Sequence, residues 1–135
     1  MTWKFLKKED GNSDDIISNK HRFSSAVYIP QKNYHFRTPK QNQIIKNTII
    51  GGKSGIELSG ADDNFVNQNK ISGSDRGISL VKDSFYGAAV APKNNIISQN
   101  VIYNINYGIY ISLSPNNVIS NNNITNYTIA DIFRE

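Results

Sequence analysis

The sequence predicts an all-β solenoid, a parallel β-helix of about four coils of a 22-residue repeat with two longer turn insertions. Three observations predict it. Asn recurs at fixed positions, Ile or Val recurs at fixed distances from each Asn, and a small residue follows. Apolar residues near each small residue alternate, as in Gly55-Ile56-Glu57-Leu58, which is the period of a β-strand. The chain of 135 residues is long enough for one domain.

Four segments of 17 residues align without gaps, and they start 22, 31 and 22 residues apart. They are residues 42–58, 64–80, 95–111 and 117–133. Their shared positions are two asparagines (Asn42, Asn64, Asn95, Asn117 and Asn47, Asn69, Asn100, Asn122), two aliphatic positions (Ile44, Val66, Ile97, Ile119 and Ile49, Ile71, Ile102, Ile124) and one small residue (Gly55, Gly77, Gly108, Ala130). We expect three short strands in each coil, aliphatic side chains stacked inside, and asparagines hydrogen-bonded from coil to coil.

The basic charge is concentrated before the first repeat. Residues 1–40 contain eight Lys or Arg and four Asp or Glu, whereas residues 41–135 contain seven of each, so the net charge of +4 belongs to the first part. We expect residues 1–25 to be a basic N-terminal lead-in or cap and residues 26–135 to be the β-helix. Residues 26–29 would be the last strand of an earlier, incomplete coil.

Several classes of protein are excluded or left open by composition. The absence of cysteine excludes disulfides and thiolate metal sites and leaves the redox compartment open. No apolar run approaches the roughly 20 residues of a membrane span, and the start of the chain is not a signal peptide. His21 and His35 are the only histidines, and no second ligand motif lies near either.

The repeat resembles a known group. Asn-x-Ile-x-x-Asn-x-Ile followed by Gly-Ile-x-Leu is similar to the right-handed parallel β-helix superfamily of pectin-lyase-like proteins, over residues 42–135. It is most similar to repeats of carbohydrate-binding and sugar-hydrolase (CASH) domains and of NosD-type periplasmic proteins. The resemblance implies a right-handed coil, a polysaccharide or glycan partner, and an extracellular, periplasmic or virion-associated location. The repeat specifies core and turn positions rather than a catalytic motif.

Long turns alternate with short ones along one edge of the predicted coil. The long turns, 30–41 and 81–94, contain Tyr34, His35, Arg37, Phe85 and Tyr86, and the short turn between them contains Asp62 and Asp63. Aromatic walls around an acidic floor predict a sugar-binding groove. In the alternative, the aromatic side chains fold back onto the coil and the aspartates are ordinary turn residues.

The outward position of the Gly-Ile-x-Leu strand predicts a second feature. It is occupied by Tyr28, Glu57, Ser79, Tyr110 and Ile132 from coil to coil. The pleat of the strand aligns these side chains on the surface. A mixed polar and aromatic stripe suits a glycan chain, and the alternative is a solvated strand face.

Catalysis is an open question at this stage. If the protein is an enzyme, we expect a polysaccharide hydrolase or lyase that uses Glu57 with Asp62 or Asp63, and Arg37 as a base. A lyase would call for calcium held by carboxylates, and no other cofactor is indicated. The motifs of β-helix epimerases and polygalacturonases are absent. Asp75 and Arg76 lie in a different turn, where we expect a solvent-exposed pair.

Two functions therefore remain. The first is a carbohydrate-binding or polysaccharide-processing module. The second is a structural or assembly module, such as a tailspike-like or surface-protein segment, whose open coil end meets another subunit or a longer parent chain, because no cap sequence follows the fourth repeat. Nucleic-acid binding through the basic residues 1–40 ranks below both, because no DNA- or RNA-reading motif is present. No membrane partner is expected.

Overall fold

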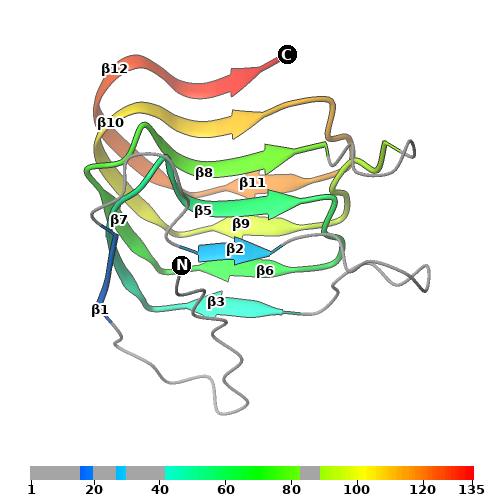
Figure 1. The fold of residues 1–135 in the computed structure, drawn as a ribbon, viewed down its shortest axis with the longest axis horizontal. Helices are drawn as coiled ribbons and strands as arrows, with labels where there is room; N and C mark the ends of the chain where they lie inside the picture. The colour runs from blue at the N-terminus through cyan, green and yellow to red at the C-terminus, as the bar shows by residue number, and fades with distance from the viewer. Residues whose placement is uncertain (1–15, 20–26, 30–41, 83–88) are drawn as a thin grey trace.

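The protein is a coil of parallel β-strands in the computed structural model (Figure 1). The structure describes residues 42–82 and 89–135 in full and residues 16–19 and 27–29 by their backbone. The strands in these ranges are β1 (Ile16–Asn19), β2 (Val27–Ile29), β3 (Gln43–Ile45), β4 (Thr48–Gly51), β5 (Ser54–Ser59), β6 (Phe65–Asn67), β7 (Lys70–Ser72), β8 (Arg76–Val81), β9 (Ile96–Ser98), β10 (Val101–Ile111), β11 (Val118–Ser120) and β12 (Asn123–Arg134).

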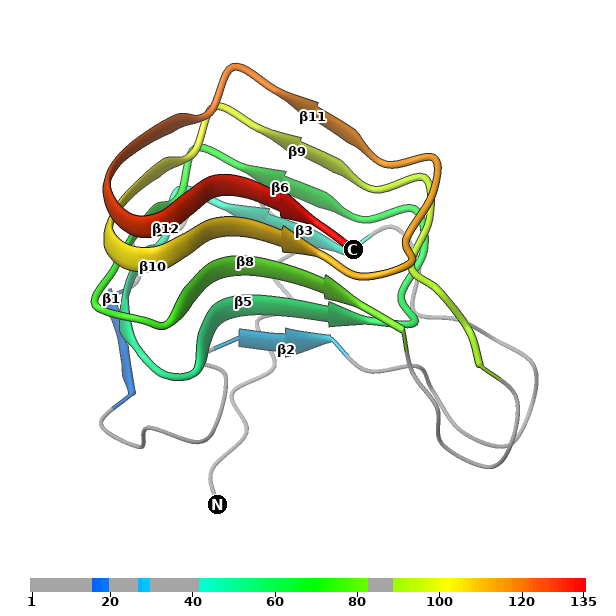
Figure 2. The same cartoon turned by 90° about the horizontal axis from the view of Figure 1, so that it is seen from above.

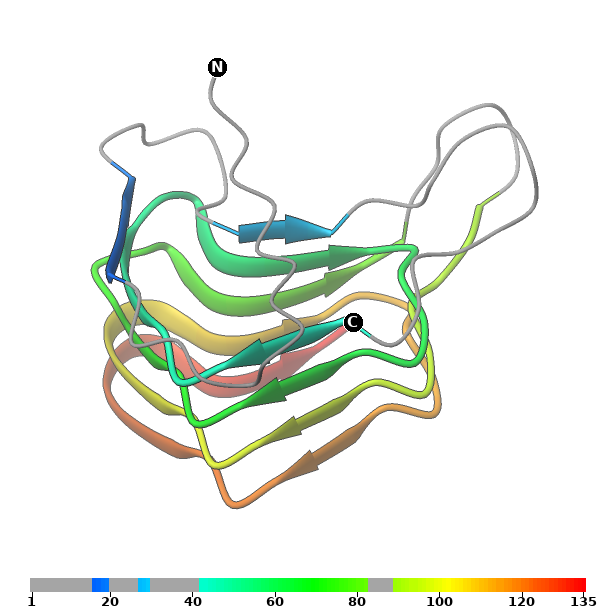
Figure 3. The ribbon, with the colours of Figure 1, turned by 90° about the horizontal axis from the view of Figure 1, so that it is seen from below.

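The strands form walls around a common interior. One wall has the order β11-β9-β6-β3, and its strands lie side by side in Figure 2. The other strands belong to a sheet with the order β1-β4-β7-β10-β8-β5-β2, with β12 on the far side of β10. Figure 3 shows β10 and β12 bending around the corner between two walls. The expected three strand segments per coil are present, although β10 and β12 each merge two of them.

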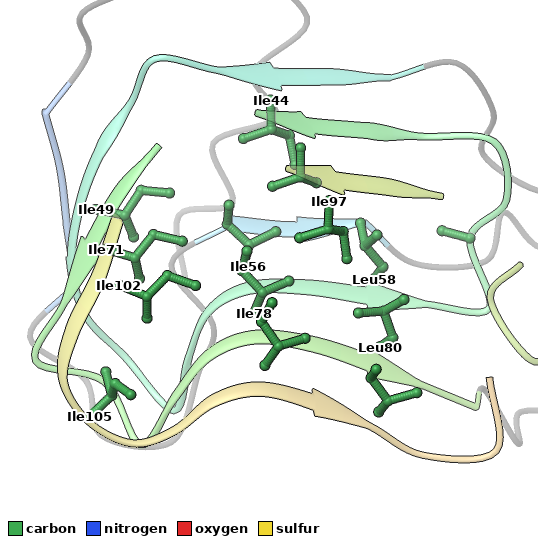
Figure 4. Close-up of a cluster of buried hydrophobic side chains, with 14 residues drawn as sticks. Ile44, Ile49, Ile56, Leu58, Ile71, Ile78, Leu80, Ile97, Ile102 and Ile105 are labelled. Atoms are coloured by element: carbon green, nitrogen blue, oxygen red, sulfur yellow. The ribbon is translucent and has the colours of Figure 1, made fainter. Parts of the chain in front are cut away.

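Aliphatic columns fill the interior, as the repeat predicts. Figure 4 shows Ile49, Ile71 and Ile102 stacked in one column. A second column in that view contains Ile56 and Ile78, and a third contains Leu58 and Leu80. All seven of these side chains are fully buried. Burial of each such side chain contributes about 1.5–3 kcal/mol to folding, so the columns dominate the stability of the coil.

Two asparagine ladders satisfy the polar turns between the walls. Along one ladder, Nδ2 of Asn47, Asn69 and Asn100 donates to Oδ1 of the next asparagine at 3.1, 3.0 and 2.9 Å. The backbone N–H of each donor residue bonds to the same oxygen, at 3.0, 2.9 and 3.0 Å. Asn42, Asn64, Asn95 and Asn117 form the second ladder in the same way. Partners are 22 or 31 residues apart, so the predicted ladders are confirmed.

The fourth repeat departs from the predicted alignment. Ala130 was expected beneath Gly108 in the small-residue column, but it pairs with Tyr107, and the register shifts between Ile105 and Tyr107. A Cβ at Gly108 would contact the Asp131 carbonyl oxygen of the following coil, as a Cβ at Gly77 would contact that of Gly108. In the fourth coil Asp131 occupies the glycine position, and β12 accommodates one extra residue as a bulge.

Two short strands precede the first full repeat. β2 pairs with β5, with Val27 opposite Ile56, as expected for the last strand of an incomplete coil. β1 lies within the segment 1–25 that we expected to be a lead-in or cap, and it pairs in parallel with β4, with Ile16 opposite Thr48. Strand pairing therefore extends into that segment. None of the described residues forms a helix of the length and hydrophobicity that a membrane span requires.

Candidate functional site

The residues of the predicted stripe lie in register along β2, β5, β8 and β10, although Ser79 and Tyr110 are buried. Glu57, Ser79 and Tyr110 occupy successive positions in register, and the backbone of Tyr28 precedes them in β2. The last member is Phe133 rather than the predicted Ile132, because the bulge in β12 places Phe133 opposite Tyr110. Ile132 instead lies opposite Ile109 in a core column. The correction exchanges an aliphatic side chain for an aromatic ring at the outer surface.

Three aromatic rings gather at the end of this stripe. Tyr107, Tyr110 and Phe133 have ring centroids 5.3 to 5.6 Å apart. Tyr110 and Phe133 are stacked, with 16° between their planes, and Tyr107 meets both rings edge-on. Such pairs prefer offset-stacked and edge-to-face geometry, so the cluster has few alternative arrangements. We call Tyr107, Tyr110 and Phe133 the aromatic cluster.

Arg76 covers the other face of Tyr110. Its guanidinium carbon lies 3.6 Å from the centroid of the Tyr110 ring, a cation–π contact. The Arg76 side chain is 22% exposed, and its Nε is buried without a hydrogen-bond partner among the described residues. The expected exposed pair with Asp75 is weak, because Nε lies 3.9 Å from Asp75 Oδ2, while Asp75 Oδ1 accepts a hydrogen bond from Asn106 Nδ2 at 2.7 Å.

Tyr110 is a structural centre rather than an open sugar platform. It is 9% exposed, and Arg76 and Phe133 occupy its two faces. Its hydroxyl donates a hydrogen bond to Glu135 Oε1 at 2.7 Å. This hydrogen bond and burial raise the pKa of Tyr110, and hydrogen bonds from Ser112 and Tyr110 lower the pKa of Glu135. The accessible parts of the aromatic cluster are the half-buried rings of Tyr107 and Phe133.

Sequence reasoning missed Tyr107, Arg76 and Phe133 as members of this site. Arg76 and Tyr107 share one outward column, since they pair with each other and Arg76 pairs with Ser54. For Arg76 and Tyr107 the signal was present in the repeat, because each immediately precedes the glycine of its coil. Phe133 could not be placed without the position of the bulge.

The predicted acidic residues occupy two different environments. Glu57 is half-buried on the outer face, and the Ser54 hydroxyl donates to its Oε2 at 3.3 Å. Asp62 is only 4% exposed, and its Oδ1 accepts the backbone N–H of Lys93 at 3.1 Å. Asp63 has a positive φ of 55°, which aspartate tolerates in turns. Asp62 therefore anchors a turn, and its role as a catalytic partner of Glu57 stays a prediction.

The other predicted groove residues cannot be placed. Tyr34, His35, Arg37, Phe85 and Tyr86 lie outside the described residues, so the groove also stays a prediction. Within residues 42–82 and 89–135, no group of three or more His, Asp or Glu side chains could hold a metal ion.

The fold and its ladders define a class, the parallel β-helix solenoid. Comparison with protein families matches residues 10–132 to the right-handed β-helix region, and the chain belongs to this family. No curated protein and no solved structure matches the chain.

Proposed function

We propose that the protein binds a glycan chain on the outer face of β8, β10 and β12. The observation that supports this function is the aromatic cluster with Arg76 stacked against it. Neighbouring coils are about 4.8 Å apart, so a ligand that lies along the coil axis meets one new residue of each column per coil. A linear polymer of repeating units suits such a surface better than a compact ligand does.

The side chains offer the contacts that sugars use. The half-buried rings of Tyr107 and Phe133 present apolar surface to the C–H face of a pyranose. The Arg76 side chain is partly exposed on this face, and guanidinium N–H groups donate to hydroxyl and carboxylate oxygens. Glu57 supplies carboxylate oxygens on the same face, and carboxylates accept hydrogen bonds from sugar hydroxyls.

The proposal is for binding and not for bond cleavage. The predicted catalytic pair combines Glu57 with Asp62 or Asp63, and the Asp62 carboxylate is buried in a turn, where it accepts a hydrogen bond from the Lys93 backbone. Hydrolysis needs two carboxyl groups that flank one glycosidic bond. Asp63 stays a predicted partner of Glu57, so cleavage is not part of the proposal.

Replacement of Tyr107 by Ala tests the site. We expect Tyr107→Ala to weaken retention on a panel of neutral and uronate-containing polysaccharides at least tenfold, or about 1.4 kcal/mol, because one exposed ring face is lost. The measurement is affinity electrophoresis of the folded variants. Tyr103→Ala is the matched control, because Tyr103 is also a half-buried tyrosine of β10 but pairs with Ser72 of β7, on another wall. Equal retention of wild type and Tyr107→Ala would refute the site.

A second function, assembly through the coil end, is favoured by a separate observation. In the last coil the core positions are uncovered: Tyr127 is 46% exposed opposite the buried Ile105, and Ile132 is 38% exposed opposite the buried Ile109. Exposed apolar surface of this kind is typical of protein interfaces. We therefore propose subunit contact at this end as the alternative role.

A further inference from the structure

The bulge in β12 places two charges on core columns of the last coil. Leu58, Leu80 and Ile111 form one inward column, and the register continues it with Arg134. Ala130 pairs with Tyr107 and Ile132 pairs with Ile109. Asp131, between them, is therefore aligned with Gly108, the glycine position of the preceding coil. Both charged residues are exposed, and they lie three residues apart on one strand.

Asp131 borders a hollow that polar and apolar residues of the last coil line together. This hollow of about 180 Å³ opens at the coil end, and Ile119, Ile124, Asp131 and Ile132 are among its lining residues. Ile119 and Ile124 belong to the core columns and are only partly buried here. A partner that covers this surface must supply apolar side chains to the hollow. It must also supply a basic group to Asp131 and an acidic group to Arg134, because an unpaired charge buried in an interface is strongly unfavourable.

An apolar coil of the repeat does not meet this requirement. The interior coils present only aliphatic residues at the column of Leu58, Leu80 and Ile111. Stacked on the last coil, such residues would bury Arg134 without a counter-charge. The same coil end on another molecule presents apolar side chains, one acidic group and one basic group, so the two surfaces are complementary in charge.

We propose that a second copy of this chain docks on the coil end through the same surface, related by a two-fold axis. An isologous interface of this kind places residue i opposite residue j of the partner and residue j opposite residue i. Asp131 of each copy then faces Arg134 of the other, and the exposed Ile132 and Tyr127 side chains are buried between the copies. The proposal rests on the assembly role and adds the identity and orientation of the partner.

A charge-swap series tests the pairing. Sedimentation equilibrium over a wide concentration range is expected to show a dimer. Asp131→Arg and Arg134→Asp, each alone, are expected to lower the association constant at least tenfold, because like charges then face each other. The double variant Asp131→Arg/Arg134→Asp is expected to restore it. Lys53→Glu, at an exposed position outside this end, is the control and leaves the association constant unchanged.

A crosslinking experiment tests the orientation independently. The chain has no cysteine, so Ile132→Cys introduces a single thiol. A short bis-maleimide is expected to join two copies through this position, since it lies between Asp131 and Arg134 near the proposed axis. If the dimer has the same association constant in the single charge variants as in the wild type, or gives no crosslink, the inference is overturned while the assembly role stands. A monomer at all concentrations overturns both.

Discussion

At the scale of single residues, glycine is required where a Cβ atom would collide with the neighbouring coil. A Cβ at Gly77 would lie 2.5 Å from the Gly108 carbonyl oxygen and 2.5 Å from Ile102 Cγ2. Neither atom can move without disturbing the pairing of β8 with β10 or a core column. The same position is Gly55 in the preceding coil, where a Cβ would also meet the next coil at less than 3 Å.

We therefore expect Gly77→Ala to destabilise the fold by about 2–4 kcal/mol in chemical denaturation, as overpacked core sites do. Gly73→Ala is the comparison, because Gly73 has a φ of +68° but its nearest Cβ neighbour would be 3.7 Å away. Only the backbone strain applies there, which costs about 1–2 kcal/mol. If Gly73→Ala proved the more damaging change, steric crowding would not be the reason for the glycine column.

At the scale of elements, the end of β12 is attached to β10 through side chains. Tyr110 donates to Glu135 at 2.7 Å, and Phe133 stacks on the Tyr110 ring. Hydrogen bonds from Ser112 and then from Tyr110 hold the pKa of the Glu135 carboxyl below 4.5. The stabilising effect of this contact is present above pH 4.5 and is lost as the pH falls through the lowered pKa of the folded state.

The pKa of Glu135 gives a direct measurement of this attachment. An NMR titration of its side-chain carboxyl carbon is expected to have a midpoint below 4.5 in the wild type. Tyr110→Phe should raise that midpoint, because one hydrogen bond to the carboxylate is removed while the ring remains. Tyr103→Phe is the control and should leave it unchanged. An identical midpoint in Tyr110→Phe and wild type would show that the Tyr110 hydrogen bond does not lower the pKa of Glu135.

The element scale is also where prediction from sequence was least complete. The strands of the first three repeats follow from the Asn, Ile and Gly spacing, because each position has one acceptable residue type. In the fourth repeat, Ile132 and Phe133 are both apolar, and either could occupy the inward position. The glycine that fixes the register elsewhere is replaced by Ala130, so the sequence contained no signal for the bulge. Phe133 was missed for this reason.

At the scale of the whole molecule, the fold class and family were predictable because polar residues repeat as regularly as apolar ones. A buried asparagine at the same position of every coil has its hydrogen bonds satisfied when it stacks on the asparagine of the next coil. The site was less predictable. Surface columns are not constrained by stacking, and Arg76 shows no regularity along the chain beyond its place before a glycine.

The ladder also connects the stability of separate coils. Asn69 Oδ1 accepts both the backbone and side-chain N–H of Asn47, and its Nδ2 donates to Ile44 O at 2.8 Å. We expect Asn69→Ala to destabilise the protein by about 2–4 kcal/mol, because buried donors and an acceptor lose their partner. Thermal unfolding measures the change. Gln68→Ala, next to it but exposed, should change stability by less than about 0.5 kcal/mol. A similar loss in both variants would argue against a special role for the ladder.

One rung of the ladder has a consequence for how such a protein can diversify. Asn64 and Asn95 are 31 residues apart, and their 3.0 Å hydrogen bond matches those between asparagines 22 residues apart. The stacking of these asparagines is therefore the same whether 22 or 31 residues separate them. Doubling the length of a flexible connection costs only about 0.6 kcal/mol of closure entropy. New peptide segments can accumulate at this edge under selection for recognition, while the stacked interior that supports them stays unchanged.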